Sequence, residues 1–417
     1  MKKTTSKYVI IGNSAAAIGA VEGIRQVDTR GRITILTDES HHTYSRPLIS
    51  YLLNGKATEQ TMKYRPDSFY DDNKCTLKHS NATKIDAKAR CVTLADGSSI
   101  TFEKLLIATG ASAHCPQYKG LETVTSRHRF MTLDDARGLE AVLGSDKRVL
   151  IIGAGLIALK CAEGVIGRAA SVTVLARSRI LSSILDEDGA AIVSQHLVSR
   201  GVDLRTGTSV VCFEGNTAVL SNDEKLEFDV LVLAVGVRPN VELLQGIAEI
   251  DRAIVVNAKS ETTAIDIYAA GDCTQTLDAS SGEQKPMAIL PTAYMQGETA
   301  GINMASTTAD TVTFDKAIPM NAIGFFGLHI ITAGNYNGQM YMGESTDAGC
   351  YKRLFFSNNK LNGYILIGDV EKAGIYTSLV REGTPLDTLD FALICEKPGL
   401  MAFSKNERET KLGGAAQ

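Results

Sequence analysis

The sequence predicts an α/β protein in which one strand–turn–helix design occurs twice in tandem before a smaller α+β domain. The stretches KYVIIGNSAAAIGAVEGI (7–24) and KRVLIIGAGLIALKCAEGV (147–165) share a basic lead-in, an apolar strand, a small-residue turn and an amphipathic helix. A buried strand ending in a glycine turn follows each copy, at 102–111 and 228–240. After about residue 311 short strands alternate with glycine turns, which is typical of an antiparallel sheet.

Length and composition limit the class of protein. A chain of 417 residues can form two or three domains, each with its own core. The formal net charge of -4 gives no attraction to nucleic acid or to an anionic membrane, and no apolar run reaches the roughly 20 residues of a membrane-spanning helix. The eight cysteines form no C-x-x-C pair, so we expect no metal site and a reducing, cytoplasmic location.

The first turn, which begins at Gly12, allows three interpretations. Met1-Lys2-Lys3 before an apolar run suggests an export signal, but the helix pattern continues through Arg25. The order G-x-S-x-A suggests a nucleophile elbow, although an elbow normally follows several strands and this turn is the first element. A phosphate-binding turn explains more, because the same design returns later in the chain.

The second turn carries the fuller pattern. Gly153, Gly155 and Ala158 occupy the places of a G-x-G-x-x-A turn. The first glycine makes the tight turn, the second lets the backbone approach a pyrophosphate, and the third small residue lets helix and strand pack closely. Leu156 and Ile157 open the helix, whose free N–H groups would face the phosphates.

The first turn departs from this pattern at one position. Gly12, Ser14 and Ala17 stand in the three places, so Ser14 adds a Cβ but also a hydroxyl that could bond a phosphate. Ala15 and Ala16 open the helix. The spaced pair of turns therefore predicts two tandem Rossmann-like dinucleotide-binding domains, whereas an unliganded small-residue turn remains the alternative for each one.

The element after the first helix is a strand that ends in acid. RITILTDE (32–39) places Asp38 about twenty residues beyond the turn, where a ribose-binding carboxylate belongs, with Glu39 as the next choice. A solvated acidic loop is the alternative interpretation.

The remaining elements follow in order. Asp96-Gly97 indicates a hairpin between strands at 90–95 and 98–102. A strand is expected at 171–176, and another within TTAIDIYAAGDCTQT (262–276) that ends in Gly271-Asp272. Helices are expected near 187–200 and over 289–305, the second with Pro291 in its first turn.

Six motifs in this order resemble the FAD- and NAD(P)-dependent pyridine nucleotide-disulfide oxidoreductase superfamily. They are IIGNSAAAIGA, YSRPLIS, LLIATG, IIGAGLIALKCAEG, LVLAVGVRPN and IYAAGDC. The likeness extends to about residue 390. Within the superfamily the chain resembles rubredoxin reductases, the flavoprotein of NADH-nitrite reductase, and FAD subunits of anaerobic iron–sulfur oxidoreductases such as phenylglyoxylate dehydrogenase.

The resemblance implies a division into domains. The implied units are a discontinuous FAD-binding domain (1–112 and 241–310), an NAD(P)-binding domain (113–240), a C-terminal α+β interface domain (311–390) and a tail (391–417). The cofactors implied are FAD and NAD(P)H. The interface domain implies a homo-oligomer or a subunit of a larger complex.

The resemblance also implies contacts for the two nucleotides. It assigns the FAD pyrophosphate to the first turn, the ribose to Asp38, the adenine to the Thr83 backbone and the ribityl chain to Asp272. The helix beginning near Pro291 would stabilise charge at the flavin N1–C2=O edge. Other implied contacts with FAD are made by Arg46, Pro47, Ala108, Thr109, Gly110, Gly271, Thr292 and Ala293, and with the nicotinamide nucleotide by Lys160, Arg177, Val235 and Gly236.

One departure bears on the chemistry. Relatives that reduce disulfides carry a redox cysteine after the acidic strand, and here that place is taken by Arg46 or a neighbour. Cys273 is the one cysteine beside a cofactor motif, and we interpret it as a packed thiol because no second cysteine lies nearby. Electrons should therefore leave the flavin directly, with no catalytic side chain between.

A second departure concerns the nicotinamide nucleotide. The strand SVTVLA (171–176) is followed by Arg177 rather than by an acid, and arginine can accommodate a 2'-phosphate, although a solvated loop residue is the alternative. Lys160 stands where many relatives have a glutamate near the nicotinamide.

The expected function is an FAD-dependent NAD(P)H oxidoreductase that exchanges single electrons with a ferredoxin- or rubredoxin-like partner. The alternatives are a stand-alone NADH oxidase or disulfide reductase using Cys273, and a non-catalytic flavin-binding assembly subunit.

Overall fold

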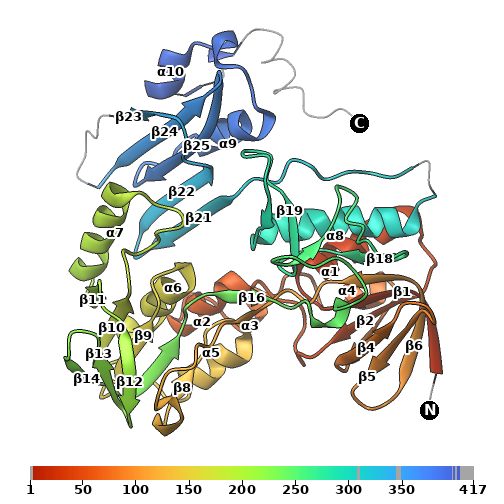
Figure 1. Cartoon of the computed structure of the whole chain (residues 1–417), viewed down its shortest axis with the longest axis horizontal. Helices are drawn as coiled ribbons and strands as arrows, with labels where there is room; N and C mark the ends of the chain where they lie inside the picture. The colour runs from red at the N-terminus through yellow and green to blue at the C-terminus, as the bar shows by residue number, and fades with distance from the viewer. Residues whose placement is uncertain (1–2, 308–309, 344–348, 397, 400–401, 404–417) are drawn as a thin grey trace.

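The computed structural model describes residues 3–307, 310–343, 349–396, 398–399 and 402–403. A mixed sheet and a parallel sheet form its two lower parts, and an antiparallel sheet forms the third (Figure 1). This arrangement confirms the predicted fold class. Most of the expected tail lies outside the described residues.

The first sheet has seven strands in the order β3-β2-β1-β6-β5-β4, with β18 paired to β6. The strands β1, β2, β3 and β18 run parallel to their partners. The strand β5 pairs antiparallel with β4 on one side and with β6 on the other. Their bounds are β1 (Lys3–Ile11), β2 (Ile33–Thr37), β3 (Cys75–His79), β4 (Ala82–Asp86), β5 (Cys91–Leu94), β6 (Ser99–Ile107) and β18 (Ile267–Ala269).

The second sheet repeats this order as β11-β10-β9-β15-β8. Its parallel strands β11-β10-β9-β15 correspond one by one to β3-β2-β1-β6, which is the tandem repeat expected from the sequence. The antiparallel strands β12, β13 and β14 form a separate small sheet. The bounds are β8 (Arg127–His128), β9 (Arg148–Ile152), β10 (Ser171–Ala176), β11 (Val202–Thr206), β12 (Val210–Glu214), β13 (Thr217–Leu220), β14 (Lys225–Glu227) and β15 (Val230–Leu233).

The expected strands at 98–102 and 102–111 form one continuous strand, β6. Its whole length pairs with β1, from Lys3↔Ser99 to Ile11↔Ile107, because the polar residues before Lys7 also join the sheet. The separate strands were a wrong prediction, since backbone pairing across the sheet does not stop where the apolar pattern changes. The Asp96-Gly97 hairpin was predicted correctly, and Gly97 has φ +77°.

The helices α1 (Ala15–Val27) and α8 (Leu290–Ala305) lie against each other over the first sheet (Figure 1). They approach so closely that a Cβ on Gly297 would lie 1.9 Å from the Ala16 carbonyl oxygen, and one on Gly301 would lie 2.2 Å from that of Ala20. Gly19 on α1 meets the α8 backbone in the same way. This glycine contact places the first turn of α8 beside the first turn of α1.

Two chain crossings join the repeats. The strands β7 (Ala111–Ala113) and β16 (Val237–Pro239) pair antiparallel where the chain leaves and re-enters the first unit. The other α-helices of the two repeats in the described residues are α2 (Ile49–Leu53), α3 (Glu59–Met62), α4 (Phe69–Asp72), α5 (Leu133–Glu140), α6 (Leu156–Val165) and α7 (Glu187–Ser199). A small sheet of β17 (Ile254–Val255), β19 (Thr274–Leu277) and β20 (Gln284–Pro286) precedes α8.

The C-terminal sheet has the order β21-β22-β25-β24-β23 and is antiparallel throughout. Its elements are β21 (Met320–Phe325), β22 (Leu328–Gly334), β23 (Gln339–Met342), β24 (Tyr351–Ser357), β25 (Lys360–Ile367), α9 (Ala373–Glu382) and α10 (Phe391–Glu396).

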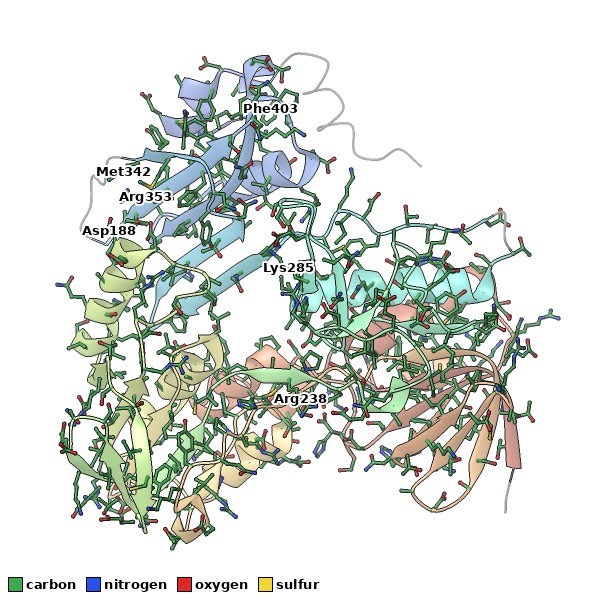
Figure 2. The ribbon with its side chains drawn as sticks, in the orientation of Figure 1. Asp188, Arg238, Lys285, Met342, Arg353 and Phe403 are labelled. Atoms are coloured by element: carbon green, nitrogen blue, oxygen red, sulfur yellow. The ribbon has the colours of Figure 1, made fainter. Side chains whose placement is uncertain are left out.

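The segment AIGFFGLHII, which begins at residue 322, forms the hairpin of β21 and β22 and packs against α6 and α7 of the same chain. Phe325 is fully buried, and the Phe326 backbone N–H donates to Glu163 Oε1 at 2.9 Å. On the next strands, Arg353 reaches Asp188 at 2.8 Å (Figure 2). This segment is therefore part of the core between the C-terminal sheet and the second repeat.

No helix in the described ranges is both long and apolar enough to cross a membrane.

Candidate functional site

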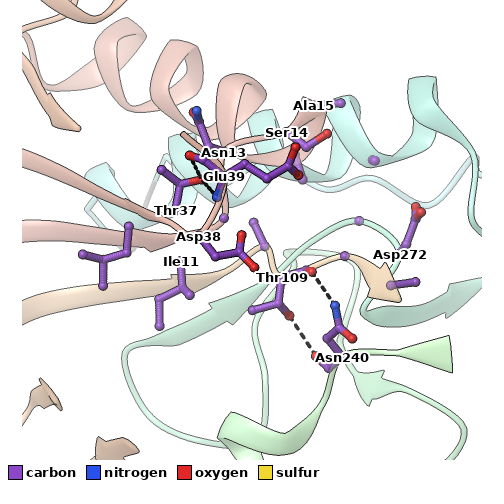
Figure 3. Close-up of a pocket in the computed structure, with 18 of the residues that line it drawn as sticks. Ile11, Asn13, Ser14, Ala15, Thr37, Asp38, Glu39, Thr109, Asn240 and Asp272 are labelled. Atoms are coloured by element: carbon purple, nitrogen blue, oxygen red, sulfur yellow. Dashed lines mark hydrogen bonds between the residues drawn. The ribbon is translucent and has the colours of Figure 1, made fainter. Parts of the chain in front are cut away.

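A cavity of about 690 Å³ lies at the carboxyl ends of β1, β2, β6 and β18, beside the first turns of α1 and α8 (Figure 3). Ligands of parallel α/β sheets bind at this edge. The residues expected to hold FAD that line it are Gly12, Ser14, Ala15, Ala16, Asp38, Glu39, Arg46, Pro47, Thr83, Ala108, Thr109, Gly110, Gly271, Asp272 and Ala293. Segments more than 250 residues apart in sequence thus meet around one space.

Three of the expected residues do not line this cavity. Ala17 is fully buried in the core beneath α1, as the third small position of the turn requires. Pro291 is exposed and Thr292 is buried in α8, whereas Leu290, one residue before Pro291, lines the cavity.

The cavity also contains residues to which the sequence analysis assigned no role. His41 and His42 follow β2, and the His42 Nε2 atom is buried without a hydrogen-bond partner in the described part of the chain. Asn240 lines the cavity and is bonded twice to Thr109. Its side-chain amide donates to the Thr109 carbonyl oxygen at 2.8 Å, and its backbone carbonyl oxygen accepts from the Thr109 hydroxyl at 2.8 Å (Figure 3). Asn13, Tyr44 and Ala270 also line the cavity and lie within the motifs IIGNSAAAIGA, YSRPLIS and IYAAGDC.

The first glycine of each turn has the same structural requirement. Gly12 has φ +117°, and a Cβ there would lie 2.0 Å from the Ala108 carbonyl oxygen. Gly153 has φ +130°, and its Cβ would lie 2.1 Å from that of Ala234. Each turn therefore needs glycine for its backbone angle and for close contact with the neighbouring strand.

The N-termini of the two helices that follow these turns are accessible to an anion. Ser14 is the N-cap of α1 but makes no capping hydrogen bond, so its hydroxyl and the first N–H groups of α1 can bind a phosphate. Gly155 caps α6, and a Cβ there would meet no atom within 4 Å. The site residues thus fit a diphosphate at both turns.

The two acids after β2 have different environments. Glu39 is paired with Arg46 and accepts from the Tyr44 hydroxyl at 2.7 Å. Arg46 also donates to the Met131 carbonyl oxygen at 3.4 Å. Asp38 is exposed at the cavity and has no such partner among the residues that the structure describes, so it is the acid free to bind a ribose (Figure 3).

Burial raises the pKa of Asp272 above the ordinary value of 3.8, and the Arg46 charge opposes this shift. The folded chain therefore holds a proton on Asp272 more tightly than the unfolded chain does. The contribution of Asp272 to the free energy of unfolding consequently falls as the pH rises from 3.8 through the pKa of the folded state. We expect FAD-free Asp272→Asn to be more stable than the wild type at pH 7.

Urea unfolding at several pH values measures this effect. The gain should shrink as the pH falls toward 3.8. A gain that is constant with pH, or a loss at pH 7, would contradict the assignment of the effect to a buried charge.

Cys273 is completely buried, and its thiol contacts the carbonyl oxygens of Ile107 and Ala270 at 3.5 and 3.4 Å. Burial raises its pKa to about 11, so it stays protonated at neutral pH. All eight cysteines are free thiols. The structure supports a packing role and leaves the flavin side of the cavity without a thiol pair.

Cys273→Ser should consequently leave the rate of flavin reduction, per bound FAD, within about twofold of the wild type. The serine hydroxyl can reach the same two carbonyl oxygens, which limits the loss of stability. Stopped-flow absorbance with NAD(P)H measures the rate. Loss of flavin reduction with full FAD content would show that the thiol takes part in the chemistry.

The residues expected to hold the nicotinamide nucleotide surround the second turn. Gly236 follows β15 with φ +117° and open space where a Cβ would be, as expected beside a ligand. Arg177 is exposed directly after β10. The residues Leu156, Ile157 and Ala158 form the first turn of α6, and Val235 lies in the loop between β15 and β16.

Lys160 points away from this turn. Its ammonium pairs with Glu163, donates to the Gly324 carbonyl oxygen at 3.1 Å and lies 4.3 Å from the centre of the Tyr51 ring. Its side chain is only 12% exposed, so Lys160 joins α6 to α2 and to the β21 hairpin. The contact of Lys160 with the nicotinamide stays a prediction.

Two family models match the chain. The model described as pyridine nucleotide-disulphide oxidoreductase matches residues 6–297, and the rubredoxin NAD+ reductase C-terminal domain matches residues 319–384. A curated relative, the NADH-dependent phenylglyoxylate dehydrogenase subunit epsilon of Aromatoleum evansii, is 34% identical over 396 residues, covering 92% of this chain and 93% of the relative.

Solved structures share the fold. Putidaredoxin reductase, in a covalent complex with putidaredoxin, superposes with a TM-score of 0.86 at 21% identity, over 99% of both chains. An engineered water-forming NADPH oxidase bound to NADPH superposes with a TM-score of 0.83 at 21% identity, over 92% of both chains. Its engineered changes include one glycine to alanine and, further on, a consecutive Asp-Ala-Met to Ala-Arg-Ser.

Proposed function

The chain belongs to the pyridine nucleotide-disulphide oxidoreductase family, and we propose that it is an FAD-dependent oxidoreductase that passes electrons between NAD(P)H and an iron–sulfur carrier protein or subunit. One observation carries the proposal: a dinucleotide-sized cavity at the first turn has a second nucleotide turn in the same chain and no thiol pair beside it.

The residues of the cavity fit FAD. The Gly12 turn and the open start of α1 bind the diphosphate, and Asp38 accepts hydrogen bonds from the ribose. The start of α8, where Leu290 and Ala293 line the cavity, directs its positive dipole end at the flavin. Bound FAD supplies hydride acceptance from nicotinamide and release of single electrons.

The protein positions the reactants and provides charge. Arg46 is held by Glu39, Tyr44 and Met131 at one wall of the cavity, where its positive charge favours the phosphate and the reduced flavin. The second turn binds the nicotinamide nucleotide through Gly153 and the first N–H groups of α6. No side chain needs to form a covalent bond.

An iron–sulfur partner follows from the missing thiol relay. Electrons must leave one at a time for an external carrier, and the described residues contain no cluster of His, Cys, Asp or Glu that could hold a metal. The rubredoxin-reductase match of the C-terminal sheet and the complex formed by putidaredoxin reductase support such a partner. The eight free thiols support a reducing, cytoplasmic location.

NADPH is one of the two nicotinamide nucleotides that we propose as electron donors or acceptors. The second turn already has Ala158, and the end of β10 reads Ala176-Arg177-Ser178. These are the residues introduced in the engineered NADPH oxidase, and Ala158 precedes Ala176 by the same interval as the corresponding changes in that protein.

Anaerobic reduction of the FAD-loaded chain tests the function. NADH or NADPH should remove the absorbance of oxidised flavin, and a ferredoxin- or rubredoxin-type protein should restore it while becoming reduced. Flavin that stays oxidised with both nucleotides would indicate a non-catalytic subunit. Reoxidation by oxygen or small disulfides alone would indicate a stand-alone oxidase or disulfide reductase.

A further inference from the structure

The ends of β2 and β10 are equivalent positions of the two repeats. The parallel ladders pair Ile11 with Leu36 in the first sheet and Ile152 with Leu175 in the second. Because Ile11 and Ile152 each precede the first glycine of a turn, Leu36 corresponds to Leu175. Two residues further along each strand, Asp38 therefore corresponds to Arg177.

The two positions carry opposite charge. The first repeat continues with Glu39, whereas Ser178 follows Arg177 in the second. The two repeats thus offer the same backbone edge to an adenosine ribose, one lined by acids and the other by a cation and a hydroxyl.

Arg177 is exposed, and its side chain makes no hydrogen bond or ion pair within the described ranges. Its neighbour Arg179 is engaged instead, because it donates to the Leu185 carbonyl oxygen at 3.1 Å and lies 3.9 Å from Glu187. The nearby Asp186 is also occupied, since it caps α7 and accepts from the Tyr351 hydroxyl.

We propose that the second nucleotide site prefers a 2'-phosphorylated adenosine and that Arg177 is the residue that determines this specificity. A free guanidinium binds a phosphate with paired, charge-assisted hydrogen bonds, and the Ser178 hydroxyl adds a donor. A carboxylate at this place would repel the phosphate and bind a free 2'-hydroxyl instead. The inference rests on the proposed function and names the substrate class of that site as NADPH.

Calorimetric titration of the FAD-loaded chain with 2',5'-ADP and with 5'-AMP tests the preference without catalysis. The wild type should bind 2',5'-ADP about tenfold to a hundredfold more tightly than 5'-AMP, as expected for a hydrogen-bonded charge pair. Arg177→Ala should remove this difference. Arg177→Glu should reverse it, because the glutamate restores the charge found after β2.

Arg200→Ala is the matched control. Arg200 is also exposed, but it caps the end of α7 shortly before β11 and so lies near the amino ends of the parallel strands, whereas Arg177 follows the carboxyl end of β10; the ratio should therefore stay at the wild-type value. Equal binding of the two ligands by the wild type, or a ratio unchanged in Arg177→Ala, would overturn the proposal.

The two proposals fail in different ways. A chain that prefers 2',5'-ADP but whose flavin is reduced by neither nucleotide would disprove the oxidoreductase function and leave the specificity standing. A chain whose flavin is reduced equally by NADH and NADPH, with equal binding of the two fragments, would disprove the specificity alone.

Discussion

Gly12→Ala is expected to abolish FAD binding and to lower the free energy of unfolding by at least about 2 kcal/mol. The added Cβ would lie 2.0 Å from the Ala108 carbonyl oxygen, so the turn or the end of β6 must move. The φ of +117° is also unfavourable for alanine. Both the turn and Ala108 line the cavity, so the movement displaces the diphosphate. Flavin content after purification and urea unfolding of the FAD-free protein measure the two effects.

Gly97→Ala separates the effect of an unfavourable backbone angle from the effect of a close contact. Gly97 also has a positive φ, +77°, but a Cβ there would meet no atom within 4 Å. This variant should lose about 1 kcal/mol and keep its FAD. If Gly12→Ala retained full FAD and was no less stable than Gly97→Ala, the close contact with β6 would not be what holds the turn.

The repeat could be predicted because its turns are locally constrained. A glycine is needed at Gly12 and Gly153 by backbone angle and contact, and a small residue is needed at Ala158, so sequence and geometry determine each other over a few residues. The acids after β2 and the arginine after β10 could be found for the same reason, since each directly follows the strand that pairs with the strand before the turn.

The rest of the cavity depends on contacts between distant segments. Asn240 bonds Thr109 across the paired crossings, and His42 enters the cavity from the loop after β2. No periodicity or spacing in the sequence links these residues. Lys160 was expected at the nicotinamide, but the β21 hairpin provides a carbonyl partner that lies far away in sequence.

The glycines of α8 show how packing reverses a local preference. Gly297 lies within a helix, where alanine is normally favoured by about 1 kcal/mol. A Cβ at this position would lie 1.9 Å from the Ala16 carbonyl oxygen, so α1 and α8 would have to separate. We therefore expect Gly297→Ala to lower the free energy of unfolding by about 2–4 kcal/mol. FAD affinity should fall as well, because the first turns of both helices line the cavity.

Gly374→Ala provides the control with the opposite sign. Gly374 lies in the first turn of α9, and a Cβ there would meet no atom within 4 Å, so the helix preference acts alone and stability should rise by up to about 1 kcal/mol. Urea unfolding gives both values, and FAD titration of the refolded proteins gives the affinities. Equal stabilisation by the two alanines would mean that α1 and α8 do not pack backbone to backbone, and the position of α8 at the flavin edge of the cavity would lose its support.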